Sequence, residues 1–123
     1  SDGVLPVQHR MTRSAEFGAT VKNGARAVQP DIVVYARQDT DSDDSSGPRI
    51  GLVVAKSVGN AVQRHRVARR LRHVARSVLG ALDGRERIVI RALPGSRDAR
   101  SGELEQQLRT GLRRTHQLME RNR

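Results

Sequence analysis

The feature that most constrains this chain is a long amphipathic segment that carries only positive charge. From about residue 61 to residue 82, apolar side chains recur at steps of three and four, which predicts a helix with one buried face. No acidic residue occurs between Asp44 and Asp83, whereas the predicted helix carries six arginines. Like charges one turn apart repel each other, so such a helix loses stability unless an anion meets its outer face. The segment therefore predicts a helix that packs on a core and binds a polyanion.

The cations of this helix gather on the side opposite the apolar residues. At about 100° per residue, the helical wheel gives one stripe and two flanks. The stripe consists of His65, Arg69, Arg72 and Arg76, and the flanks hold Arg66, Arg70 and His73. A merely solvated face is the plain alternative, but solvated faces ordinarily mix both signs. The net charge of +10 also favours a polyanionic partner, and we expect the stripe to bind phosphate.

Length and composition limit the remaining possibilities. A chain of 123 residues suits one domain, for which we predict the range 14–119, preceded by a basic and flexible arm over residues 1–13. No apolar run approaches the roughly 18 residues that span a bilayer, so nucleic acid is favoured over a membrane as the partner. The absence of cysteine excludes disulfides and thiolate sites, and it fits a cytoplasmic location.

Short helices and strands alternate along the rest of the chain. Ser14 is a plausible N-cap for a helix over 15–23. The predicted strands cover 31–37, 49–55 and 87–92, and a last helix covers 101–119. We expect the first two strands, joined by an acidic loop over 38–48, to form an antiparallel pair. The order α-β-β-α-β-α predicts an α+β fold, a single-domain sandwich with helices packed on a small sheet.

A second candidate surface is apolar and aromatic. Alternation along the first strand places Ile32 and Val34 on one face and Val33 and Tyr35 on the other. Together with Phe17, the latter pair predicts a shallow platform on which bases of a single strand stack. Phe17 and Tyr35 are the chain's only Phe and Tyr. The alternative is that these residues belong to the core.

The sequence gives little support for chemistry by the protein itself. The acidic run that begins at Asp39 has Asp44 and Ile50 where a calcium loop requires Gly and Glu. The four histidines show no metal-ligand spacing with carboxylates, and no phosphate-binding glycine loop is present. We therefore predict no catalytic residue, no metal and no cofactor bound by the protein.

The stretch 49–72, RIGLVVAKSVGNAVQRHRVARRLR, resembles the signature of the bacterial ribonuclease P protein subunit. In that family a strand runs into a lysine, a Gly-Asn-Ala turn and a helix that begins with an Arg-rich triplet. Segments 14–17, 22–24 and 88–91 agree with the family as well, so the resemblance covers about residues 10–118. It implies a small central sheet with three helices and a left-handed strand-helix-strand crossover, against the usual right-handed rule.

The resemblance also implies a function. The family's catalytic RNA, and not its protein, removes the 5′ leader from precursor transfer RNA, using magnesium ions held by RNA. The protein is then one subunit of an endoribonuclease, and it binds the catalytic RNA and the single-stranded leader. The RNA-binding positions carried over are Lys56, Asn60, Arg64, His65, Arg66, Arg69, Arg70 and Arg72, to which the stripe adds Arg76. The leader-cleft positions are Phe17, Val21, Val33 and Tyr35.

Four positions depart from the family pattern. His65 stands where the family usually has Asn, Val21 where it often has a second Phe, and Ser57 and Ala68 where lysines are common. Val21 implies apolar contact with the leader in place of stacking. The central arginine stripe is untouched by these departures.

Three other functions remain open on the residues alone. A structural RNA-binding protein would share the charge and the size but need no leader cleft. A DNA-binding module is disfavoured because no helix-turn-helix pair occurs at the usual short spacing, so we expect no DNA partner. A stand-alone nuclease needs metal-binding carboxylates at the cleft, and the sequence offers none there.

Overall fold

Four strands and three helices make up the part of the chain that the structure, a computed structural model, describes: residues 4–40 and 47–121. In chain order they are α1 (Ser14–Asn23), β1 (Ala25–Val28), β2 (Ile32–Gln38), β3 (Arg49–Val53), α2 (Ala61–Val78), β4 (Glu86–Ala92) and α3 (Ser101–Arg121). Short 3-10 turns lie at Val7–His9, Lys56–Val58, Leu79–Ala81 and Pro94–Arg97. The predicted α+β fold with three helices on one small sheet is confirmed.

The strands form one sheet in the order β1-β2-β4-β3. β4 pairs antiparallel with β2 and parallel with β3. The predicted pairing of 31–37 with 49–55 is therefore wrong, because β4 lies between these two strands. β4 is the strand whose residues 86–90 are all buried. Its Ile88, Val89 and Ile90 alternate between the two faces, and such a strand gains most from the centre of a sheet, where both faces are covered.

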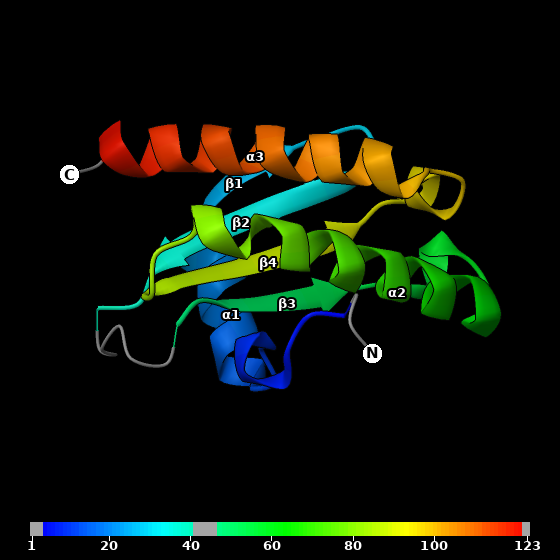
Figure 1. Ribbon diagram of the computed structural model, residues 1–123, viewed down its shortest axis with the longest axis horizontal. Coiled ribbons are helices and arrows are strands. Elements are labelled where there is room, and N and C mark those ends of the chain that lie inside the picture. The colour runs from blue at the N-terminus through cyan, green and yellow to red at the C-terminus, as the bar shows by residue number, and fades with distance from the viewer. Residues whose placement is uncertain (1–3, 41–46, 122–123) are drawn as a thin grey trace.

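The connection from β3 through α2 to β4 is a left-handed crossover, as the family resemblance implied. In Figure 1, α2 lies in front of the sheet, β3 runs to the right and β4 lies above it. Turned a quarter turn anticlockwise, so that β3 points upward, the picture has β4 to the left of β3. A right-handed crossover would have placed β4 on the right.

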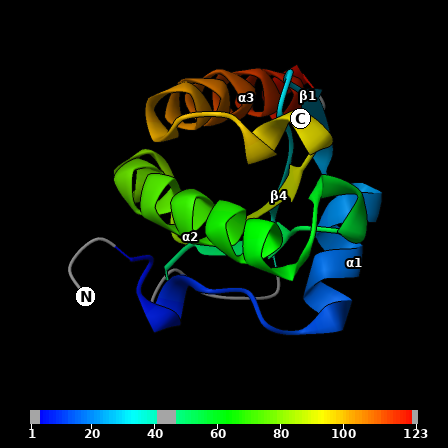
Figure 2. The same cartoon turned by 90° about the vertical axis from the view of Figure 1, so that its right-hand side faces the viewer.

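The sheet separates two layers of helix (Figure 2). α2 and α3 cover one face and α1 covers the other. The larger core lies under α2 and α3 and includes Ile32 and Val34, whereas Val33 and Tyr35 point toward α1. The predicted alternation along this strand is thus confirmed.

Several element boundaries differ from the predictions. β1 was not predicted, because four residues after a glycine carry too short a pattern to be read. Ser14 is the first residue of α1 and not its N-cap; Arg13 precedes the helix without a side-chain cap bond. α2 ends at Val78, and the residues that follow form a 3-10 turn.

The segment before α1 packs on the domain. Leu5 is 1% exposed and belongs to the larger core, and Met11 is 5% exposed and lies under α1. The Met11 amide donates to the Ile50 carbonyl at 2.9 Å, so the segment runs along the edge of β3. Residues Leu5 and Met11 of the predicted arm over 1–13 therefore pack on the domain, and the flexibility of the arm stays a prediction. Residues 1–3 of that arm, and 41–46 of the predicted acidic loop, lie outside the described residues.

Candidate nucleic-acid interface

The start of α2 is fixed by a capping box. The Asn60 side-chain oxygen accepts from the backbone amide of Gln63 at 2.8 Å, and the Gln63 side-chain oxygen accepts from the backbone amide of Asn60 at 2.9 Å. The glycine before Asn60 leaves room for this exchange, since a Cβ on Gly59 would lie only 2.3 Å from Gln63 Oε1. The side-chain oxygen of Asn60 is thus engaged in the cap. The side-chain nitrogen of this exposed residue remains as a donor to a ligand.

The outer face of α2 is lined by cationic side chains. Its inner face is buried through Val67, Leu71, Val74 and Val78, as the periodicity predicts. On the outside, Lys56, His65, Arg66, Arg69 and Arg76 are exposed, and Arg64 and Arg72 are half-buried. Within residues 4–40 and 47–121, no arginine of α2 forms a salt bridge. The arginines of the predicted stripe therefore lie on the outer side of α2 without a salt-bridge partner among the residues that the structure describes.

Two arginines of the predicted RNA-binding set, Arg70 and Arg64, have polar atoms that face the protein itself. One terminal nitrogen of Arg70 donates to the carbonyls of Arg97 and Ala99, at 3.3 and 3.2 Å, and so ties α2 to the segment before α3. The Nε atom of Arg64 is buried, and it finds no hydrogen-bond partner among the described residues. Arg70 therefore contributes to the packing of the helical layer, whatever it contributes to binding.

The predicted leader residues lie on the sheet face that α1 covers. Val33 and Tyr35 form a small apolar cluster with Met11 and Val89, and the Phe17 ring packs against it. Val33 and Tyr35 are each 6% exposed, so they mainly support this face from below. Phe17 is half-buried and Val21 is 42% exposed, so these two α1 residues offer more surface to a ligand.

One row of this sheet face stays open beside α1, and the sequence analysis missed it. The strand register aligns Val28, Val33, Arg91 and Val53 across the four strands. Val28 is 61% exposed, Val53 is 36% exposed and Arg91 is exposed, so the row forms an apolar floor with one cation. The available signal was Arg91, a charge directly after the apolar run Ile88–Val89–Ile90 of β4. The alignment of Arg91 with the three valines depends on the sheet register, which cannot be read from the sequence.

A buried charge network holds α1 to the sheet. Arg87 is 2% exposed, and its Nε donates to the Glu16 carboxylate at 3.0 Å. Its terminal nitrogen lies 3.7 Å from the Asp39 carboxylate. Arg37 donates to the Thr20 hydroxyl at 3.1 Å. These contacts fix the position of α1, and hence of Phe17, relative to the strands.

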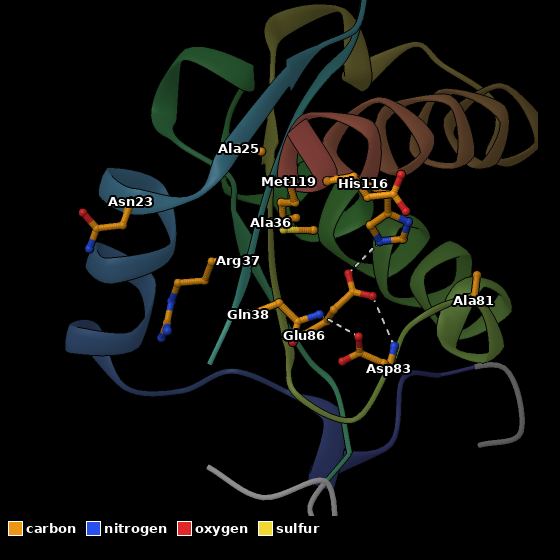
Figure 3. A pocket seen from close by; sticks show the side chains of 11 residues that line it. Asn23, Ala25, Ala36, Arg37, Gln38, Ala81, Asp83, Glu86, His116 and Met119 are labelled. Atoms are coloured by element: carbon orange, nitrogen blue, oxygen red, sulfur yellow. Dashed lines mark hydrogen bonds and ion pairs between the residues drawn. The ribbon is translucent and has the colours of Figure 1, made fainter. Parts of the chain in front are cut away.

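A separate pocket of about 720 Å³ opens at the far end of the molecule, where α3 ends (Figure 3). Inside it, His116 Nε2 lies 2.7 Å from the Glu86 carboxylate, which also accepts from the Asp83 amide at 3.1 Å. Gln38 donates to the Asp83 carboxylate at 2.6 Å. Carboxylates repel phosphate, so this pocket is not part of the basic surface.

Neither a metal site nor a membrane-spanning helix occurs among the described residues. In the described part of the chain, no group of three or more His, Asp or Glu side chains is placed to hold a metal ion. No helix among the described residues is long and apolar enough to cross a membrane. The absence of a protein-bound cofactor stays a prediction.

Fold and surface together define a class: a small α+β domain with a cation-rich helix on one face of its sheet and an apolar cluster under α1 on the other. Comparison with known proteins gives the family. The family model described as Ribonuclease P matches residues 5–116. A ribonuclease P protein component from Mycobacterium avium is 65% identical over 112 residues, covering 90% of this chain and 94% of that relative. One from Mycolicibacterium vanbaalenii is 64% identical over 114 residues, covering 93% and 95%. The chain therefore belongs to the ribonuclease P protein family, and the resemblance inferred from residues 49–72 is confirmed.

Solved structures agree with the fold. The ribonuclease P protein of Staphylococcus aureus superposes with a TM-score of 0.73 at 24% identity, covering 85% of this chain and 93% of that one. The protein from Thermotoga maritima gives a TM-score of 0.71 at 21% identity, covering 85% and 96%. At these identities the likeness concerns the fold alone.

Proposed function

We propose that this chain is the RNA-binding subunit of ribonuclease P, which assists a catalytic RNA in removing the 5′ leader from precursor transfer RNA. The observation that carries the proposal is the basic outer face of α2, whose arginines form no salt bridge within residues 4–40 and 47–121, together with the apolar sheet face under α1. Membership of the family supports it. The protein binds and positions RNA in this proposal, while the catalytic RNA and its magnesium ions perform the hydrolysis.

The basic face of α2 supplies the affinity for the catalytic RNA. Phosphates neutralised by Arg66, Arg69, Arg76 and their neighbours release bound counterions, which makes such binding strong at low salt. The same phosphates remove the repulsion among these arginines, which is otherwise a cost to the folded helix. Arginine's planar group of donors suits phosphate oxygens better than lysine does.

The cleft beside α1 takes the leader. A single strand has unstacked bases and a charged backbone, and it needs an apolar surface with nearby cations. The open row provides valine side chains for the bases and Arg91 for a phosphate. Because Val21 replaces a ring here, we expect apolar contact at that position and stacking only at Phe17. Such contacts discriminate a precursor from a mature transfer RNA without reading sequence.

The test is cleavage of precursor transfer RNA at low magnesium with the cognate catalytic RNA, with and without this protein. We expect the protein to restore correct 5′ cleavage and to be inert without the RNA. If it does nothing in either setting, a structural RNA-binding role replaces the proposal. If it cleaves alone, the chemistry lies in the protein and the proposal is overturned.

The proposed partners are the catalytic RNA and the precursor's leader, and neither DNA nor a membrane is required. We propose a cytoplasmic site of action, because both RNAs are transcribed there in bacteria.

A further inference from the structure

A glycine lies buried in the middle of an edge strand, where a side chain is normally needed. Gly51 belongs to β3 and is directly opposite Val89 of β4, on the face toward α1. Glycine weakens the interior of a strand, because it packs nothing and loses more conformational freedom on folding than other residues. A buried strand glycine therefore often marks a place where another group must approach the backbone closely.

The group that approaches Gly51 is the ring of Phe17. A Cβ built on Gly51 would lie 2.5 Å from both Cε1 and Cζ of that ring, and 3.1 Å from the Cβ of Met11. The ring thus occupies the volume that the missing side chain would fill. Gly51 and Phe17 are 34 residues apart in the chain and meet only because α1 covers this end of the sheet.

We propose that Gly51 is a positioning residue for the leader cleft: the notch it leaves seats the Phe17 ring against the sheet. The seated ring forms one wall of the cleft and keeps the neighbouring row around Arg91 open. This inference rests on the proposed function of the cleft. It adds a determinant of leader binding at a position that has no side chain to touch the leader.

The anchoring of α1 explains why a change at Gly51 reaches the ring. Glu16, next to Phe17, is bonded to the buried Arg87, and Thr20 accepts from Arg37. These bonds hold the helix on both sides of Phe17, so α1 cannot retreat from an added methyl group. The ring itself must turn away, and it then leaves its place in the cleft wall.

The first experiment compares Gly51→Ala with Gly18→Ala. Gly18 lies next to Phe17 in α1, and a Cβ there would meet nothing within 4 Å, so it is a matched control. Binding of precursor and of mature transfer RNA is measured with the reconstituted holoenzyme. We expect Gly51→Ala to lower the preference for precursor by about fivefold or more, the contribution of one base stacked on a ring. Gly18→Ala should keep the preference. A preference retained in Gly51→Ala would overturn the proposal.

The second experiment removes the ring. In a Phe17→Ala background the added methyl group has room, so Gly51→Ala should cause no further loss of precursor preference. An equal loss in both backgrounds would show that Gly51 acts independently of Phe17, and would overturn the proposal.

If Gly51→Ala alone fails to fold, melting curves of the double variant decide. Recovery of folding when Phe17→Ala is added supports the seat, and no recovery overturns it. A wild-type holoenzyme without any precursor preference would instead refute the proposed leader function, which keeps the two failures apart.

Discussion

Replacing Arg69 and Arg76 together by glutamine tests the basic face of α2 most directly. Both side chains are exposed on the predicted stripe, and they lie seven residues apart, or about 10.5 Å along the helix. Each phosphate contact contributes about 0.7–0.9 to the slope of log affinity against log salt, so losing two lowers the slope by about 1.4–1.8. When the salt concentration rises fourfold, the affinity of the variant should therefore fall by a factor about ten times smaller than the factor for the wild type.

The assay is titration of the catalytic RNA with each protein between about 50 and 200 mM salt, the range in which such contacts dominate. A matched control replaces Arg113 and Arg114 of α3 by glutamine, which changes the net charge equally but leaves the α2 face intact. Both are exposed. We expect the control to keep nearly the wild-type slope. Equal slopes for all three proteins would refute the assignment of the RNA-binding face. Equal reductions in both variants would mean that net charge alone, and no particular face, determines binding.

Three other substitutions test separate parts of the structure. Asn60→Ala removes the cap of α2 and should lower the free energy of unfolding by about 1 kcal/mol in a urea titration. Arg70→Met removes the donor of two hydrogen bonds to carbonyls before α3 and should lower the free energy of unfolding by about 0.5–1.5 kcal/mol, whereas Arg66→Met, on the exposed face, should change it little. Arg91→Gln should weaken binding of precursor more than of mature transfer RNA at unchanged thermal stability; equal weakening of both would remove Arg91 from the leader cleft.

Periodicity and charge were sufficient to predict the helices and the basic face. α2 has a clear apolar stripe, and its outer face lacks any acidic residue, so both its burial and its exposed cations follow from local order in the sequence. The alternation of Val33 and Tyr35 with Ile32 and Val34 gave the two sheet faces in the same way.

Properties that depend on distant partners were not predictable in this way. The central place of β4 depends on its pairing with strands that begin 54 and 37 residues earlier. The open row around Arg91 exists only once that register is formed. Leu5 and Met11 were assigned to an arm because isolated apolar residues show no period, although each fills a gap in the core.

The strand order also affects how this protein reaches its fold. β2 and β3 are synthesised before β4, the strand that finally separates them. Until residue 92 has been made, each has one edge without its native partner, and an antiparallel hairpin between β2 and β3 is the nearest available pairing. A hairpin of that kind, if it formed, would have to open before β4 could enter. Sheets that are closed by such distant contacts fold slowly and expose strand edges for longer. For this chain, the strand that completes the sheet is also the last of the four described strands to be made, so the edges of β2 and β3 stay open until then.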